Sequence, residues 1–217
     1  MCRDTTSLRM DERRFRFVGW TDVSPEKWLR QWSALYDGDD DPTYHELIKI
    51  AKAGALSGAD FERIGKWKDG AEADGKWKPN VAMVAYKIWM EAACEMPKCP
   101  TENRIAEFLK NWSEREYRDE YKSGLMRVKR FGLSRATTLL HFISGGRFPI
   151  FDSRVVAAVS RLIGSPAEYT VCWYVDRFCG IFSEIAAACG STDDVRTVDK
   201  ALFCYGAVRF PKTDPRV

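Results

Sequence analysis

Two helical patterns meet in the sequence Phe131-Gly132-Leu133-Ser134-Arg135-Ala136-Thr137-Thr138. Residues 125–131 predict a short helix, residues 132–134 a tight turn with glycine at a positive φ angle, and residues 135–143 a second helix. Such a turn directs backbone N–H groups outward at the start of the second helix, where the helix dipole is also positive. These donors predict a binding site for one phosphate group, to which Thr137 or Thr138 adds a hydroxyl.

The turn lies in a segment that has no acidic residue between Glu120 and Asp152. Six basic residues lie in this segment: Lys122, Arg127, Lys129, Arg130, Arg135 and Arg147. The whole chain has 34 basic and 31 acidic residues, so its net charge of +3 does not by itself indicate a polyanionic partner. The clustering does, because phosphate backbones bind basic surfaces. The alternative is a helical hairpin packed in the core, with its basic residues forming a solvated face.

The acid-free segment ends in the sequence Ile150-Phe151-Asp152-Ser153-Arg154-Val155. An apolar helical pattern follows as far as Gly164, and Asp is a favourable N-cap directly before a helix. Capping alone is a sufficient reason for Asp152. A capping carboxylate is also held rigidly, however, and a lone acid beside a phosphate-binding surface is suited to chemistry. We therefore predict that Asp152 is a catalytic residue.

The remaining sequence predicts an all-α fold. A helix is expected at Ser24-Pro25-Glu26, where Ser is the cap and Pro occupies the first turn, and another begins near Tyr44. Phe61 and Ile64 indicate a short further piece, whereas Gly65 to Asn80 is rich in Gly, Lys and Trp and predicts an exposed loop. Alternating β-branched runs are scarce. Further helices are expected over residues 81–92, over residues 101–112 and from residue 113.

Composition narrows the class of protein. Hydrophobic residues make up 45% of the 217 residues and charged residues 30%, which is typical of a globular domain. We expect no membrane association, since neither a signal peptide nor a membrane-spanning segment is evident. The seven cysteines are an odd number without close spacing, which favours a reducing cytoplasm and neither an iron–sulfur nor a zinc site. We expect a monomer without metal or cofactor.

The stretch from Leu125 to Gly164 resembles the helix-hairpin-helix superfamily of base-excision DNA glycosylases. The family pattern is a hairpin of the form apolar-x-Gly-apolar-Gly-x-x-Thr-Ala, followed by Val-Asp-Thr-His-Val and an apolar helix that ends in Arg-Leu-Gly. Residues 131–138 match the hairpin, with Ser134 in place of its second glycine, and residues 150–155 match the second element. Asp152 falls on the family's catalytic aspartate. Ala136 falls on the position that is lysine in lyase-competent members, so the resemblance implies no Schiff-base chemistry.

The resemblance implies two helical lobes with a cleft between them. One lobe would comprise residues 39–148 and end in the hairpin at residues 125–143; the other would join residues 1–38 to residues 149–217 and carry Asp152. Residues expected to contact double-stranded DNA are Lys129, Arg130, Gly132, Ser134, Arg135, Thr137, Thr138, Ser153 and Arg154. Candidates for stacking on an extruded base are Trp67, Trp77, Trp89 and Tyr205, with ordinary packing as the alternative for each.

The implied function is that of a monofunctional DNA glycosylase, which extrudes a modified or damaged base and hydrolyses its N-glycosidic bond to leave an abasic site. The weak match outside about forty residues suggests an unusual substrate, such as hypermodified cytosine in viral DNA, and hence a defence enzyme. One alternative is a non-catalytic helix-hairpin-helix module that binds DNA for a partner. Another is a helical protein without a nucleic-acid role.

Overall fold

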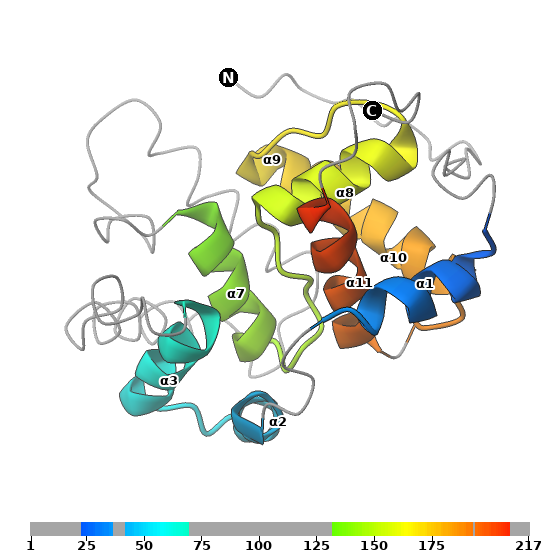
Figure 1. Cartoon of the computed structure of the whole chain (residues 1–217). Coiled ribbons are helices and arrows are strands. Elements are labelled where there is room, and N and C mark those ends of the chain that lie inside the picture. The colour runs from blue at the N-terminus through cyan, green and yellow to red at the C-terminus, as the bar shows by residue number, and fades with distance from the viewer. Residues whose placement is uncertain (1–22, 37–41, 70–131, 193, 209–217) are drawn as a thin grey trace, which may run out of the picture.

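The computed structural model describes residues 23–36, 42–69, 132–192 and 194–208, which fold into helices without any strand in these ranges (Figure 1). The all-α prediction is therefore confirmed for this part of the chain. The helices are α1 (Pro25–Ser33), α2 (Pro42–Lys52), α3 (Gly58–Asp69), α7 (Leu133–Ile143), α8 (Ser153–Ile163), α9 (Val171–Trp173), the π-helical turn η4 (Tyr174–Phe178), α10 (Cys179–Ala188) and α11 (Val195–Ala207). The helices expected within residues 81–131 lie outside the described residues.

The helix ends follow the local signals in the sequence. Ser24 caps α1 by accepting a hydrogen bond from the Lys27 backbone N–H, and Pro25 opens its first turn. Asp152 caps α8, which ends before Gly164 in the left-handed conformation. Glycine tolerates that conformation because it lacks a Cβ atom. Both predicted helices are thus confirmed at their predicted ends.

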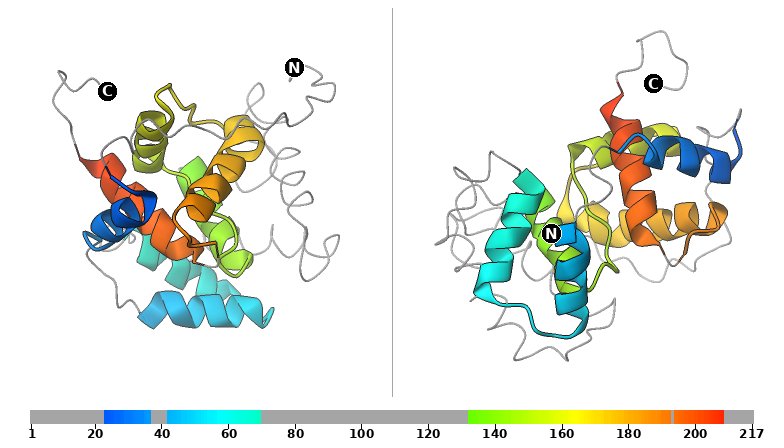
Figure 2. Two further views of the ribbon diagram at one scale, coloured as in Figure 1. Left: turned by 90° about the vertical axis from the view of Figure 1, so that its right-hand side faces the viewer. Right: turned by 60° about the horizontal axis from the view of Figure 1, so that its bottom comes forward.

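The described helices pack in two groups. Helices α2, α3 and α7 pack against one another, whereas α11 packs against both α8 and α1, with α10 also in contact with α1 and α11 (Figures 1 and 2). Apolar side chains from α1, α7, α8, η4, α10 and α11 merge in one core. The segment between α7 and α8 belongs to this core through Phe148 and Phe151, so it connects the two groups.

Helix α11 approaches the beginning of α8 unusually closely. Gly206 lies directly against the backbone of Arg154, and a Cβ atom at Gly206 would overlap the Arg154 carbonyl group. Absence of a side chain at this position therefore permits the close crossing of α11 and α8. The crossing places one face of α11 next to the residues that begin α8.

Two local predictions were wrong. The first part of the loop predicted over residues 65–80 is helical as far as Asp69, because Phe61 and Ile64 are fully buried and continue one apolar face of α3, and residues 70–80 lie outside the described residues. The predicted positive φ at Gly132 is also not observed: its φ is −82°, and it is the extended N-cap of α7, which begins at Leu133. Within the described ranges, none of the helices combines the length and apolar character needed to cross a membrane.

Candidate active site

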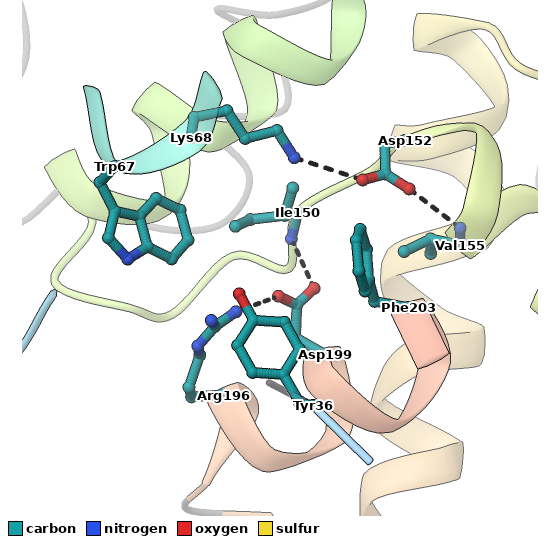
Figure 3. A pocket seen from close by; sticks show the side chains of 9 residues that line it. All are labelled: Tyr36, Trp67, Lys68, Ile150, Asp152, Val155, Arg196, Asp199 and Phe203. Carbon is teal, nitrogen blue, oxygen red and sulfur yellow. Dashed lines mark hydrogen bonds and ion pairs between the residues drawn. The ribbon is translucent and has the colours of Figure 1, made fainter. Parts of the chain in front are cut away.

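A cavity of about 70 Å³ lies between α3 on one side and α8 and α11 on the other. Figure 3 shows Lys68 reaching from α3 towards Asp152 at the start of α8, with Tyr36 in front of Asp199. Charged groups and aromatic rings thus line the same cavity. The lining residues are Tyr36, Trp67, Lys68, Ile150, Asp152, Val155, Arg196, Asp199 and Phe203.

The two carboxylate oxygens of Asp152 have different partners. Oδ1 accepts hydrogen bonds from the backbone N–H groups of Arg154 and Val155, at 3.0 and 3.1 Å. Oδ2 accepts a hydrogen bond from Nζ of Lys68 at 3.2 Å, and the two side chains are 13% and 16% exposed. The N-cap hydrogen bonds therefore fix the orientation of the carboxylate through Oδ1, while Oδ2 faces the long, flexible side chain of Lys68.

Side chains from three other helices hold the backbone that precedes Asp152. The Tyr174 hydroxyl donates to the Pro149 carbonyl oxygen at 2.9 Å, and the Ile150 N–H donates to Asp199 Oδ1 at 3.2 Å. The Phe151 N–H donates to Thr137 Oγ1 at 3.0 Å. Each of these groups is buried, so the hydrogen bonds do not compete with bulk water. Asp152 is consequently fixed relative to η4, α11 and α7 together.

Arg196 and Asp199 form a second ion pair, within α11. Arg196 Nη1 donates to Asp199 Oδ2 at 2.9 Å, and Asp199 Oδ1 accepts from Ile150 as described above. The guanidinium lies over the rings of Tyr36, Tyr44 and Trp67, with its carbon 4.8, 4.9 and 5.0 Å from the ring centroids. Burial raises the pKa of Asp199 to about 6, and the charge of Arg196 opposes this rise.

The polar groups of this pocket have two chemical capabilities. A fixed carboxylate can stabilise a positive charge that develops on a bound molecule, and an adjacent amine can donate a proton or react with a carbonyl carbon. The cavity is smaller than the engineered cavity of about 150 Å³ that binds benzene. A planar aromatic ligand such as a nucleobase therefore requires the pocket to widen. Movement of Lys68 away from Asp152 would widen it.

Five of the residues expected to contact DNA are at least partly exposed. Gly132, Ser153 and Arg154 are exposed, and Ser134 and Arg135 are half-buried in the first turn of α7, so all five lie at the N-termini of α7 and α8. Lys129 and Arg130 lie outside the described residues.

The prediction that the threonines contact phosphate was wrong. Thr137 and Thr138 are fully buried, and their hydroxyl groups donate to backbone carbonyls of the preceding turn, including that of Ser134. The two threonines therefore form hydrogen bonds within α7 instead of with a phosphate group.

Of the predicted base-stacking residues, Trp67 lines the cavity. Tyr205 does not: it is buried in the core, with its ring edge-on to Trp28 and Trp32 at centroid distances of 5.6 and 5.0 Å. The prediction for Tyr205 was therefore wrong, because its place on α11 turns it towards α1. Trp77 and Trp89 lie outside the described residues.

Sequence reasoning missed five charged or aromatic lining residues: Tyr36, Lys68, Arg196, Asp199 and Phe203. Lys68 was assigned to an exposed loop. Asp199 and Phe203 are four residues apart and therefore lie on one face of α11, so helical periodicity was a signal for this pair. Nothing local indicated that this face would meet Asp152.

No protein-family model, curated protein or solved structure matches this chain. Interpretation of the pocket therefore rests on its own geometry and on the motifs in the sequence.

Proposed function

We propose that the chain is a DNA glycosylase that extrudes a modified or damaged base from double-stranded DNA and breaks its bond to the sugar. The observation that carries this proposal is the fixed carboxylate of Asp152 in the wall of a pocket with aromatic sides. Breaking an N-glycosidic bond builds positive charge on the deoxyribose, and a preorganised carboxylate stabilises that charge. The same carboxylate can orient or deprotonate the attacking water.

Helix α7 supports a role for DNA phosphate next to this pocket. It follows exposed Gly132, its N-terminus is the positive end of the helix dipole, and Arg135 lies in the first turn. Thr137, one turn further along α7, binds the Phe151 N–H directly before Asp152. A phosphate held at the start of α7 would therefore have a fixed position relative to the catalytic carboxylate, as an enzyme acting on one nucleotide requires.

The proposed architecture is the two-lobed helix-hairpin-helix glycosylase fold, with the pocket between α3 and the pair α8 and α11. Trp67 and Phe203 are suitably placed on the lining to contact an extruded base. Ala136 is buried within α7 and carries no amine, so this position supplies no nucleophile to the reaction. We further propose that the protein acts without cofactor, as a cytoplasmic monomer, on an unusual base such as the hypermodified cytosine of viral DNA.

Duplexes that each carry one modified base provide the test. The protein is incubated with oxidised, alkylated, deaminated, mispaired and hypermodified-cytosine duplexes, and released base is measured by mass spectrometry alongside alkali-labile sites in the strand. Release of one class of base is the expected result. Salt-dependent DNA binding without release of any base would instead favour the non-catalytic binding module, and absence of both would remove the nucleic-acid role.

A further inference from the structure

We propose that Arg196 contacts the extruded base, which stacks as an uncharged ring between the guanidinium of Arg196 and the indole of Trp67. The inference rests on the proposed function, which supplies the identity of the ligand as a base in DNA. It adds a residue and a limit on substrate charge that the sequence motifs did not indicate. Its basis is a planar cation on one wall of the pocket and an aromatic ring on the other.

Arg196 and Trp67 belong to facing walls of the cavity. Trp67 lies on α3 and Arg196 on α11, and both line the cavity, as Figure 3 shows. The guanidinium carbon lies over the indole ring, 5.0 Å from its centroid. Guanidinium planes and aromatic rings are the side-chain groups on which unpaired bases stack. A base between these two groups would therefore have a stacking surface on each of its faces.

The α11 wall holds the guanidinium in a fixed place. Nη1 of Arg196 donates to Asp199 Oδ2 at 2.9 Å, and Asp199 Oδ1 accepts from the Ile150 N–H, two residues before Asp152. The side chains of Arg196 and Asp199 are 14% and 5% exposed. One buried carboxylate thus holds both the guanidinium and the backbone that leads to Asp152. A base stacked on Arg196 consequently has a fixed position relative to the proposed catalytic carboxylate.

The α3 wall is attached differently. Among the described residues, the core shared by α1, α7, α8, η4, α10 and α11 contains no apolar side chain from α2 or α3. Helix α3 packs on α2 and α7 instead. A ring enters between Trp67 and Arg196 only when α3 moves away from α11 by the thickness of that ring. Since Lys68 follows Trp67 directly, the same movement draws Nζ away from Asp152 Oδ2 and exposes this oxygen to the sugar.

A purely structural contact between an arginine and a ring is made by Arg161 of α8. Its guanidinium carbon is 5.8 Å from the Tyr205 ring centroid, and its Nη1 donates to the Tyr205 carbonyl oxygen at 2.7 Å. Tyr205 belongs to α11, which packs on α8 directly, and neither residue lines the cavity. The contact between Arg196 and Trp67 differs, because it spans the cavity between two groups of helices.

The guanidinium also limits the charge of the base. A cation is attracted to the electron-rich face of an uncharged ring and is repelled by a ring that carries a positive charge. Asp199 binds Nη1 at the edge of the guanidinium plane, which leaves the face of the plane for stacking. We therefore expect uncharged modified bases as substrates, and discrimination against positively charged bases such as N7-alkylated guanine.

Ligand binding tests this contact without DNA and without knowledge of the excised base. The probes are free adenine, cytosine and hypoxanthine, together with the 7-methylguanosine cation and its uncharged isostere 7-methyl-7-deazaguanosine, and saturation-transfer NMR measures their affinities. Wild-type protein should bind the uncharged probes and should bind the cation more weakly than its isostere. Arg196→Met and Trp67→Leu should each weaken binding of the uncharged probes by about tenfold or more.

Two further variants control for charge and for folding. Lys200→Met removes another cation from α11, one that lies over the Tyr36 ring outside the cavity lining, and should bind all probes as the wild-type protein does. Arg196→Met combined with Asp199→Asn avoids an unpaired buried carboxylate and keeps an oxygen for the Ile150 N–H. This double variant should bind the uncharged probes as weakly as Arg196→Met and should no longer discriminate against the cation.

The outcomes separate the two proposals. Wild-type affinity in the folded double variant, or equal affinity of wild-type protein for the cation and its isostere, overturns the assignment of Arg196. Release of a base from DNA by protein that binds none of the probes overturns the stacking site and leaves the glycosylase proposal standing. Binding that depends on Arg196, without release of any base from DNA, supports the stacking site and contradicts the glycosylase. Absence of both binding and release overturns both proposals.

Two measurements secure these comparisons. Circular dichroism checks the fold of each variant. Intermolecular nuclear Overhauser effects between a bound probe and the Trp67 indole should locate the ligand in the wild-type protein, and this result does not depend on any variant. Contacts of the bound probe with other rings but not with Trp67 would overturn the proposed site.

Discussion

The pocket contains two ion pairs that differ in how firmly they are held. Arg196 and Asp199 belong to one helix, and both oxygens of Asp199 are occupied, by the guanidinium and by the Ile150 N–H. Lys68 and Asp152 are 84 residues apart in sequence and belong to different helices, and only a lysine amine covers Asp152 Oδ2 among the described groups. The first pair organises the pocket. The second leaves an oxygen that becomes available when one flexible side chain moves.

Breaking the firmly held pair should have the largest effect on stability. Asp199→Ala leaves the partly buried Arg196 guanidinium and the buried Ile150 N–H without their acceptor, which should lower the free energy of unfolding by about 3–5 kcal/mol. Asp152→Ala loses an N-cap and should cost about 1 kcal/mol. Urea unfolding at neutral pH measures both. Equal losses for the two variants would contradict the assigned difference between the pairs.

The pH dependence of stability should depend on His141, because the cations of both ion pairs, Arg196 and Lys68, help to lower its pKa. Burial, together with the smaller effect of the charges of Arg196 and Lys68, lowers the pKa of His141 to about 4. Its Nε2 is 2.9 Å from the Tyr44 hydroxyl and its Nδ1 is 2.6 Å from the Phe148 carbonyl oxygen, an arrangement that suits the neutral ring. Between about pH 6.5 and 4 the unfolded chain binds a proton here and the folded chain does not.

The contribution of His141 to the free energy of unfolding should therefore be complete above pH 6.5 and should fall as the pH is lowered towards 4, whereas Asp199, whose pKa burial raises to about 6, contributes in the opposite direction below that pH. Titration of this one residue contributes at most about 1.4 kcal/mol per pH unit. His141→Gln should flatten this fall, and urea unfolding across the pH range measures it. The second histidine, exposed His45 on α2, provides the control, and His45→Gln should keep the wild-type slope. An unchanged slope in His141→Gln would show that this ring is not buried as a neutral group.

These contrasts show what local sequence can and cannot predict. The caps Ser24 and Asp152 and the stop at Gly164 are local signals, and each was found. Lys68 was missed because glycine and lysine after Ile64 suggested a loop, whereas burial of the α3 apolar face keeps this segment helical. Its pairing with Asp152 depends on how α3 packs, and no motif within either segment encodes that distance.

DNA binding should show a smaller effect, which concerns the start of α7 and the residues before it. Replacing Lys129, Arg130 and Arg135 together by alanine should weaken duplex binding and flatten the log–log dependence of affinity on salt by about 0.9 for each phosphate contact removed. Fluorescence anisotropy at several salt concentrations measures this slope. The charge-matched control replaces exposed Lys27, Lys49 and Lys66, which lie on α1, α2 and α3. Equal loss in both triple variants would exclude a specific phosphate site at the hairpin.

The rate of base release by Asp152→Asn tests the central claim most directly. Asparagine preserves the shape of the side chain and its capping oxygen, so the fold and DNA binding should survive, but it lacks the charge that stabilises a sugar cation. The matched control is Asp194→Asn, which changes the N-cap of α11 at an exposed position. Single-turnover release should slow by about 10²–10³-fold in Asp152→Asn and remain unchanged in Asp194→Asn. A wild-type rate in folded Asp152→Asn would contradict a catalytic role for this carboxylate.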